Sequence, residues 1–171
     1  MTRPATIDAS NTIDATDFKS IMGTLCKTVT VVTTMAGDRP HGTTVSAFSS
    51  LSLEPAMISV ALDRKSRLLA YAEQTGRIGV NFLGTEQGDL ALAMAGKGQD
   101  KFDSVDWSLC DGLPRIGGAL GWLACDIAQF VPGGDHVVLF GTVTHTAHEK
   151  GLPLVYGHKL FGTHSALLTP R

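Results

Sequence analysis

The sequence GTTVSAFSSLSLEP, residues 42–55, alternates between apolar and small polar side chains. Successive side chains of a β-strand point to opposite faces, so this alternation predicts one strand with two different faces. The odd positions supply an apolar face that we expect to pack in the core, formed by Val45, Ala47, Leu51 and Leu53. The even positions supply a face of small hydroxyl groups, interrupted once by an aromatic ring: Thr44, Ser46, Phe48, Ser50 and Ser52. Such a face is either the wet side of an antiparallel strand or a surface that holds a polar ligand.

The bulk composition indicates one globular domain. The chain has 171 residues, of which 43% are apolar and 18% are charged, and its formal net charge is -2. These values are typical of a folded protein, and they argue against a nucleic-acid binder or a basic protein of the membrane surface. We expect residues 1–13 to form a flexible N-terminal arm and residues 14–171 to form one domain.

The cysteines and the N-terminus indicate a reducing compartment. Cys26, Cys110 and Cys125 are odd in number and form no C-x-x-C pair, so neither a disulfide framework nor a zinc-thiolate site is expected. The N-terminal residues hold no apolar segment typical of a secretion signal, and no apolar run has the length of a membrane span. We therefore expect a cytoplasmic protein that makes no membrane contact.

The rest of the chain reads as strands with a few helices. Amphipathic spacing and end signals predict helices over 14–27, 64–76 and 85–96. Runs of β-branched and alternating residues predict strands over 28–36, 42–55, 56–63, 77–83, 122–131, 136–150 and 153–164, and a charged loop over 97–114. Strands and helices do not alternate as far as the C-terminus, which disfavours a doubly wound parallel sheet. The predicted fold class is mainly β with a few helices, an antiparallel barrel.

The sequence lacks the motifs of the common nucleotide, zinc and hydrolase sites. It contains no G-x-G-x-x-G after a strand, no P-loop, no H-E-x-x-H and no G-x-S-x-G. His145 and His148 are three positions apart in an expected strand, so their side chains should point to opposite faces and share no metal ion. His41 follows a turn and is expected at the surface. No metal site is therefore predicted.

The strand expected over 56–63 extends the polar surface of its neighbour. Its non-core face is also small and polar, formed by Ser59, Ala61 and Asp63. Two such strands side by side would make a shallow shelf against which a flat ring could lie. The strand leads into a helix start where three basic residues surround Ser66: Arg64, Lys65 and Arg67. A helix N-terminus binds phosphate readily, although a solvated cap explains the cluster equally simply. Shelf and phosphate site together are the layout that flavin mononucleotide would need.

These segments resemble those of a known protein family. From about residue 16 to residue 163 the chain is similar to the short-chain flavin reductases, the reductase components of two-component flavin-dependent monooxygenases. The resemblance is carried, in this order, by GTTVSAFSSLSLEPAMISVALDRKSR, GRIGVNFL, DKFDSVDW, LACDI, PGGDHVVLFGTV and PLVYGHKLFG. It implies the FMN-binding split β-barrel, a Greek-key-like antiparallel barrel.

The resemblance also assigns roles to residues of this chain. Along the isoalloxazine ring it places Thr44, Val45, Ser46, Ala47, Ser49 and Ser50. Near the ribityl and phosphate groups it places Asp63, Arg64 and Ser66, with Lys101 and Phe102 approaching from a loop and Tyr156 completing the cofactor-binding set. Asp135 and His136 lie where the nicotinamide would stack, and His136 is the expected catalytic residue, orienting the nicotinamide or supplying a proton near flavin N1. Without the resemblance, GGDH is only a hairpin corner with an exposed histidine.

The implied activity is hydride transfer from NADH or NADPH to FMN or FAD. The resemblance further implies a homodimer and a separate flavin-dependent oxygenase that receives the reduced flavin. The residues alone do not exclude two other functions. The barrel could store flavin or transfer electrons without turning over NADH, or it could be an enzyme like the pyridoxamine-phosphate oxidases, which share the split barrel.

Overall fold

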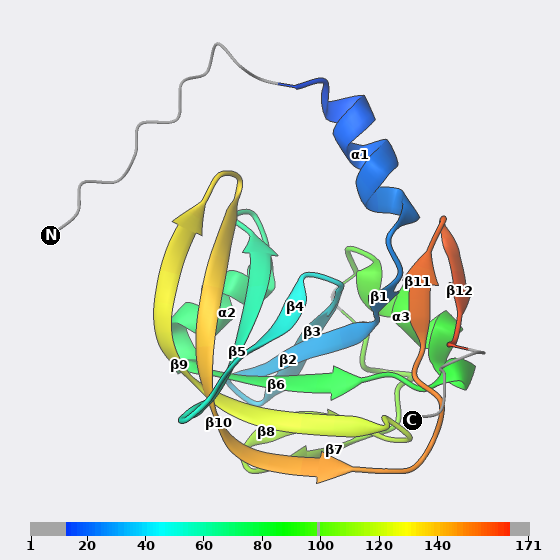
Figure 1. Cartoon of the computed structure of the whole chain (residues 1–171). Helices are drawn as coiled ribbons and strands as arrows, with labels where there is room; N and C mark the ends of the chain where they lie inside the picture. Colours follow the sequence, from blue (N-terminus) through cyan, green and yellow to red (C-terminus); the bar gives the residue numbers. More distant parts are fainter. Residues whose placement is uncertain (1–12, 99, 165–171) are drawn as a thin grey trace, which may run out of the picture.

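A seven-stranded antiparallel sheet coils around the main core, in the order β3-β2-β6-β9-β10-β5-β4 (Figure 1). The structure is a computed structural model that describes residues 13–98 and 100–164, so the expected N-terminal arm falls, apart from Ile13, outside the described residues. The sheet contains β2 (Thr30–Ala36), β3 (Arg39–Val45), β4 (Phe48–Leu53), β5 (Ala56–Asp63), β6 (Arg77–Phe82), β9 (Gly121–Gly133) and β10 (His136–His148). Each strand runs antiparallel to its neighbours. The prediction of a mainly β, antiparallel fold is confirmed.

Smaller elements cover this sheet. The helices are α1 (Ala15–Thr24), α2 (Arg67–Thr75) and α3 (Gly88–Ala95), with a short 3-10 turn η2 (Thr85–Gln87) before α3. The remaining strands are β1 (Lys27–Thr28), β11 (Val155–Gly157) and β12 (Leu160–Gly162), which form one small sheet, and β7 (Trp107–Cys110) and β8 (Leu113–Ile116), which form a hairpin. Within the described part of the chain, no helix is both long and apolar enough to cross a membrane.

The main core lies against the inner face of the large sheet. Three alternate residues of β5 are buried, namely Ile58, Val60 and Leu62. Ile78 and Val80 of β6 and Leu139 of β10 are buried with them. Helix α2 closes one side of this core with Leu68, Leu69 and Ala72. Full burial of each large aliphatic side chain contributes about 1.5–3 kcal/mol. A second cluster around Val31, Leu83 and Met94 packs beneath α3.

The stretch over 42–55 is two strands, not one. β3 ends at Val45 and β4 begins at Phe48, so the chain leaves the sheet at Ser46 and Ala47. The break shifts the alternation. Val45 is buried, but Leu51 and Leu53 of the expected core face are 47% and 90% exposed. Phe48, expected on the polar face, packs against the main core and meets Phe82 edge to face, with 5.1 Å between ring centroids. The prediction of an apolar odd face is therefore wrong beyond Val45.

Two of the helix ends follow the expected end signals. Asp14 is the N-cap of α1, and its carboxylate accepts a hydrogen bond of 2.6 Å from the backbone N–H of Thr16. Gly76 ends α2 with φ of 67°, in the left-handed region that glycine adopts at little cost. Helix α1 buries none of its residues, and Figure 1 shows it standing away from the barrel.

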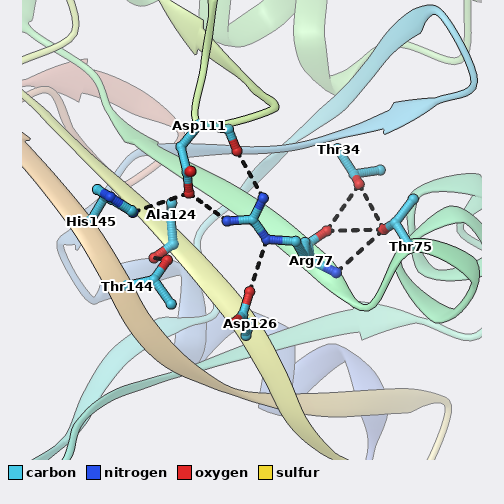
Figure 2. Close-up of polar contacts among 8 residues, drawn as sticks. All are labelled: Thr34, Thr75, Arg77, Asp111, Ala124, Asp126, Thr144 and His145. Carbon is cyan, nitrogen blue, oxygen red and sulfur yellow. Dashed lines mark hydrogen bonds and ion pairs between the residues drawn. The ribbon is translucent and has the colours of Figure 1, made fainter.

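The β7–β8 hairpin begins inside the segment 97–114 expected to be a loop and extends to Ile116, so that expectation is wrong for its second half. Arg77 of β6 ties the hairpin to the barrel (Figure 2). Its guanidinium donates to the backbone carbonyl and the carboxylate of Asp111, and through Nε to Asp126 Oδ1 of β9 at 2.8 Å. The buried amide of Asn81 makes a second link, because it accepts from the N–H of Ile116 at 2.8 Å and donates to Val31 O at 3.1 Å.

Candidate functional site

A shallow pocket of about 270 Å³ lies where the end of β3, the end of β5 and the start of α2 meet. We call it the ring pocket. It is lined by Thr43, Thr44, Val45, Ser46, Ala47, Ala61, Leu62, Asp63, Ser66 and His136. Most of these side chains are small. Such a surface suits a flat ring with polar edges, because backbone N–H and C=O groups can reach it.

The break between β3 and β4, at Ser46 and Ala47, forms the floor of the ring pocket. Ser46 and Ala47 have left the β3 pairing, and the chain is held to β5 by a hydrogen bond of 2.9 Å from Ala61 N to Ala47 O. The hydroxyl of Thr44 does not face a ligand here, because it donates to Ala91 O of α3 at 2.6 Å. Thr44 would therefore serve a ligand through its backbone, and its side chain joins β3 to α3.

The turn between β9 and β10 forms a corner of the ring pocket. His136 opens β10 opposite Asp63 of β5. Arg64 secures the corner, because its Nε donates to Gly134 O at 2.8 Å and its backbone N–H donates to Asp135 O at 3.0 Å. The Asp63 carboxylate accepts from Lys65 N at 2.6 Å and holds the next loop. His136 and the start of α2 are thus fixed relative to each other.

Asp135 orients the ring of His136. Its Oδ1 lies 2.7 Å from His136 Nδ1, and 42% of the His136 side chain is exposed. The hydrogen bond with His136, helped by the charge of that ring, holds the pKa of the Asp135 carboxyl below its usual range. Asp135 is therefore ionised at neutral pH and can only accept. Nδ1 is therefore the donor of this hydrogen bond.

A larger pocket of about 560 Å³ adjoins the ring pocket, with which it shares Thr43, Asp63 and Ser66. We call it the basic pocket, after its side chains His41, Lys65, Arg67, Lys97 and Lys101. Ser66 is the N-cap of α2, and its side chain makes no capping hydrogen bond. The N-terminus of a nine-residue helix thus opens on the pocket, which favours a negatively charged ligand.

Two groups of the basic pocket show its electrostatic character. Burial, together with the charges of Arg67 and Lys101, lowers the pKa of His41. Burial and then the charge of Arg67 lower the pKa of Lys101, although Lys101 Nζ donates to Met94 O at 2.7 Å and to Gly42 O at 3.2 Å. The expectation that His41 is a surface residue is wrong, because it is half-buried and its ring meets Tyr71 edge to face.

The structure brings most of the expected site residues together. The ring pocket contains Thr44, Val45, Ser46, Ala47, Asp63, Ser66 and His136, and the basic pocket contains Lys101. Arg64 and Asp135 form the corner beside them. The others lie elsewhere: Ser49 and Ser50 are exposed on β4, Phe102 is buried in the second core cluster, and Tyr156 lies on β11 beside α1.

Sequence reasoning missed several lining residues. Thr43 and Leu62 were in predicted strands but carried no special signal, and His41 was placed at the surface. Lys65 and Arg67 belong to the basic cluster around Ser66, so the sequence could have predicted that they line the pocket. Lys97 lies thirty-one positions after Ser66 in a segment without a recognisable motif, and only the fold brings the two together.

The mostly antiparallel β-barrel is the split-barrel fold of solved flavin reductases. A family model described as a flavin reductase like domain matches residues 22–165. The chain therefore belongs to the flavin reductase-like family, as its resemblance predicted.

Three relatives illustrate this membership. The chain is 38% identical over 132 residues to the reductase subunit HsaB of a flavin-dependent monooxygenase from Mycobacterium tuberculosis, which spans 77% of this chain and 71% of the relative. It is 33% identical over 150 residues to FMN reductase (NADH) SmoA of Agrobacterium fabrum, spanning 86% of this chain and 85% of the relative. The solved structure of NADH:FAD oxidoreductase SgcE6 from Streptomyces globisporus C-1027, in complex with NAD and FAD fragments, superimposes with a TM-score of 0.85 at 28% identity, over 89% of this chain and 93% of that one.

Proposed function

We propose that the chain is an NADH-dependent flavin reductase that supplies reduced flavin to a separate monooxygenase. The observation that carries this proposal is the junction of the ring pocket with the basic pocket, with His136 at the rim, in a chain of the flavin reductase-like family. The names of the relatives support it, since they include a monooxygenase reductase subunit and an NADH-dependent FMN reductase.

The residues present fit a flavin. The small side chains and open backbone between Thr43 and Ala47 leave room for a flat ring, and the basic pocket matches the charge of its phosphate. A bound flavin would accept the hydride and NADH would donate it. The protein therefore has to position the two molecules and needs no reactive group of its own. Holding two reactants about 3–3.5 Å apart can contribute roughly 7–11 kcal/mol. In this scheme His136, held by Asp135, orients the nicotinamide.

The two rival functions are less well supported. A flavin-storage protein would need to enclose its ligand, whereas the ring pocket is shallow and open. An enzyme like the pyridoxamine-phosphate oxidases would share the barrel, but the family match and the relatives named above concern flavin reductases.

Steady NADH consumption with free flavin tests the proposal. Purified protein is mixed with NADH and a catalytic amount of FMN or FAD in air, which reoxidises the flavin. We expect continued loss of NADH absorbance that depends on both protein and flavin. A single stoichiometric reduction, or none, would instead indicate a storage protein and contradict the proposal.

We also propose that the chain acts in the cytoplasm as a homodimer. The support for a dimer is an unburied apolar face, on which Phe18 and Ile21 of α1 and Leu25, the residue after it, are 52%, 65% and 49% exposed. Light scattering should give twice the 18.0 kDa mass of the chain. A fully active monomer would contradict this proposal and leave the catalytic one intact.

A further inference from the structure

The ring pocket and the basic pocket continue into a third depression. This outer pocket, of about 90 Å³, is lined by Ala36, Arg39, Pro40, His41, Arg67 and Tyr71. It shares His41 and Arg67 with the basic pocket, which in turn shares Thr43, Asp63 and Ser66 with the ring pocket. The three pockets therefore form one continuous depression, which runs from the ring pocket through the basic pocket to the outer pocket with its aromatic rings.

The basic pocket carries more positive charge than one phosphate monoester requires. Lys65 and Arg67 enter it from the start of α2, and Lys97 and Lys101 enter it from the segment after α3. None of these four forms an ion pair with an acidic residue of the described chain. Among the described residues, Asp63 has the one carboxylate that lines the pocket, and this carboxylate accepts a hydrogen bond from Lys65 N. Uncompensated cations on two opposite elements suit two linked phosphates better than one.

The outer pocket offers a stacking surface for a base. The rings of His41 and Tyr71 meet edge to face, with centroids 5.0 Å apart at 70°. Arg67 lines both the outer pocket and the basic pocket. Its Nη2 donates to Lys97 O at 2.9 Å and to Gly98 O at 3.2 Å. Aromatic rings and guanidinium planes are the groups on which proteins stack purines.

We propose that this chain takes flavin adenine dinucleotide in preference to FMN, with the pyrophosphate in the basic pocket and the adenine against His41 and Tyr71. This inference rests on the proposed function, since it requires the ring pocket to hold the flavin ring. NADH carries the same adenosine diphosphate group. The flavin is favoured because Asp63 and Ser66 belong to both pockets, so the chain of atoms leaving the ring pocket enters the basic pocket directly.

Flavin affinity measured in two variants tests the proposal. Dissociation constants for FAD and FMN are measured by flavin fluorescence in wild type, Tyr71→Leu and Lys97→Gln, with Lys150→Gln as the charge-matched control. Lys150 is exposed and lines none of the three pockets. Thermal unfolding checks that each variant folds. We expect wild type to bind FAD at least about tenfold more tightly than FMN, and each site variant to weaken FAD roughly 5- to 100-fold. In Tyr71→Leu the FMN affinity should change less than about twofold, since the single phosphate of FMN does not reach the outer pocket. Lys97→Gln should weaken FMN as well, but less than FAD, because Lys97 lines the basic pocket that receives either one phosphate or two.

Other results overturn the inference separately from the proposed function. Equal affinity for the two flavins, or equal weakening of both by Tyr71→Leu, contradicts the adenine site while leaving flavin reduction intact. A raised KM for NADH at saturating FMN, with an unchanged dissociation constant for FAD, assigns the outer pocket to NADH and also contradicts it. If wild type neither binds nor reduces either flavin, the proposed function itself fails.

Discussion

At the scale of single residues, His136 is the side chain whose replacement separates the two substrates. It lies at the rim of the ring pocket, and Asp135 fixes its ring. We expect His136→Ala to lower kcat/KM for NADH roughly 5- to 150-fold, the loss of a contact of about 1–3 kcal/mol. The dissociation constant of the flavin should hardly change, because the floor and the basic pocket are untouched.

His148→Ala is the matched control for that experiment. His148 ends the same strand, is exposed and lines none of the described pockets named above. Its replacement should leave both parameters at the wild-type level. Wild-type NADH kinetics in a folded, flavin-binding His136→Ala variant would reduce GGDH to an ordinary hairpin corner.

Leu139, three positions after His136, serves stability rather than catalysis. Its side chain is fully buried, and it lies between Val60 of β5 and Phe130 of β9 in the sheet. Leu139→Ala should lower the free energy of unfolding by about 2–5 kcal/mol, since it removes buried methyl groups and leaves a cavity. Denaturant unfolding measures this. Leu53→Ala is the control, and a loss as large at that exposed position would mean that the core has been misplaced.

Cys125 should be inert in the folded protein. Burial, the dominant cause, raises the pKa of its thiol to about 12, so the reactive thiolate is scarce at any pH below that value. Cys26 is exposed. A thiol reagent at pH 8 should modify Cys26 rapidly and Cys125 only after unfolding, as peptide mass analysis would show. Rapid modification of Cys125 in native protein would contradict its burial.

At the scale of elements, the Arg77 cluster should give the β7–β8 hairpin a stability that depends on pH. The hydrogen bond from Arg77 holds the pKa of Asp111 below its ordinary 3.8, with His145 contributing. A carboxyl whose folded pKa is depressed stabilises the fold above its unfolded pKa and loses that contribution as the pH falls through the folded value. Wild type should therefore exceed Arg77→Gln in stability at pH 7, and the difference should shrink below about pH 4.

The control for the hairpin is Arg115→Gln, since Arg115 makes a looser pair with Glu149 at 3.6 Å. Exposed pairs of this kind contribute little. Urea unfolding from pH 3 to pH 7 compares the variants. A stability difference for Arg77→Gln that stays constant down to pH 3 would show that Asp111 is not the group it stabilises.

The elements were predictable where local chemistry decides them. Asp14 before α1, Gly76 after α2 and the Gly-Gly-Asp turn before β10 all carry their signals in a few residues. The break at Ser46 and Ala47 was not, because small residues continue an alternating pattern equally well. Its cause lies elsewhere, in the pairing of Ala47 with Ala61 and of Thr44 with α3. The β7–β8 hairpin is short and polar, and it is held by Arg77 and Asn81 from another strand.

At the scale of the whole molecule, the site is a product of the barrel. The fold brings the end of β3, the β5–α2 loop, the segment after α3 and the start of β10 to one surface. Family resemblance located most of the ring pocket, since its residues are local in sequence. It did not supply the basic and outer pockets in full, because His41, Lys97 and Tyr71 become neighbours only when the sheet closes.

The most direct test of the central claim is anaerobic reduction of flavin by NADH in a protein whose ring pocket is filled. Ala61→Phe places a large side chain in this pocket, and Ala128→Phe, on an exposed position of β9, is the control. After rapid mixing with NADH, the visible absorbance of flavin should bleach in wild type and Ala128→Phe, and hardly change in folded Ala61→Phe. Bleaching at the wild-type rate in Ala61→Phe would place flavin reduction elsewhere on the molecule and contradict the account.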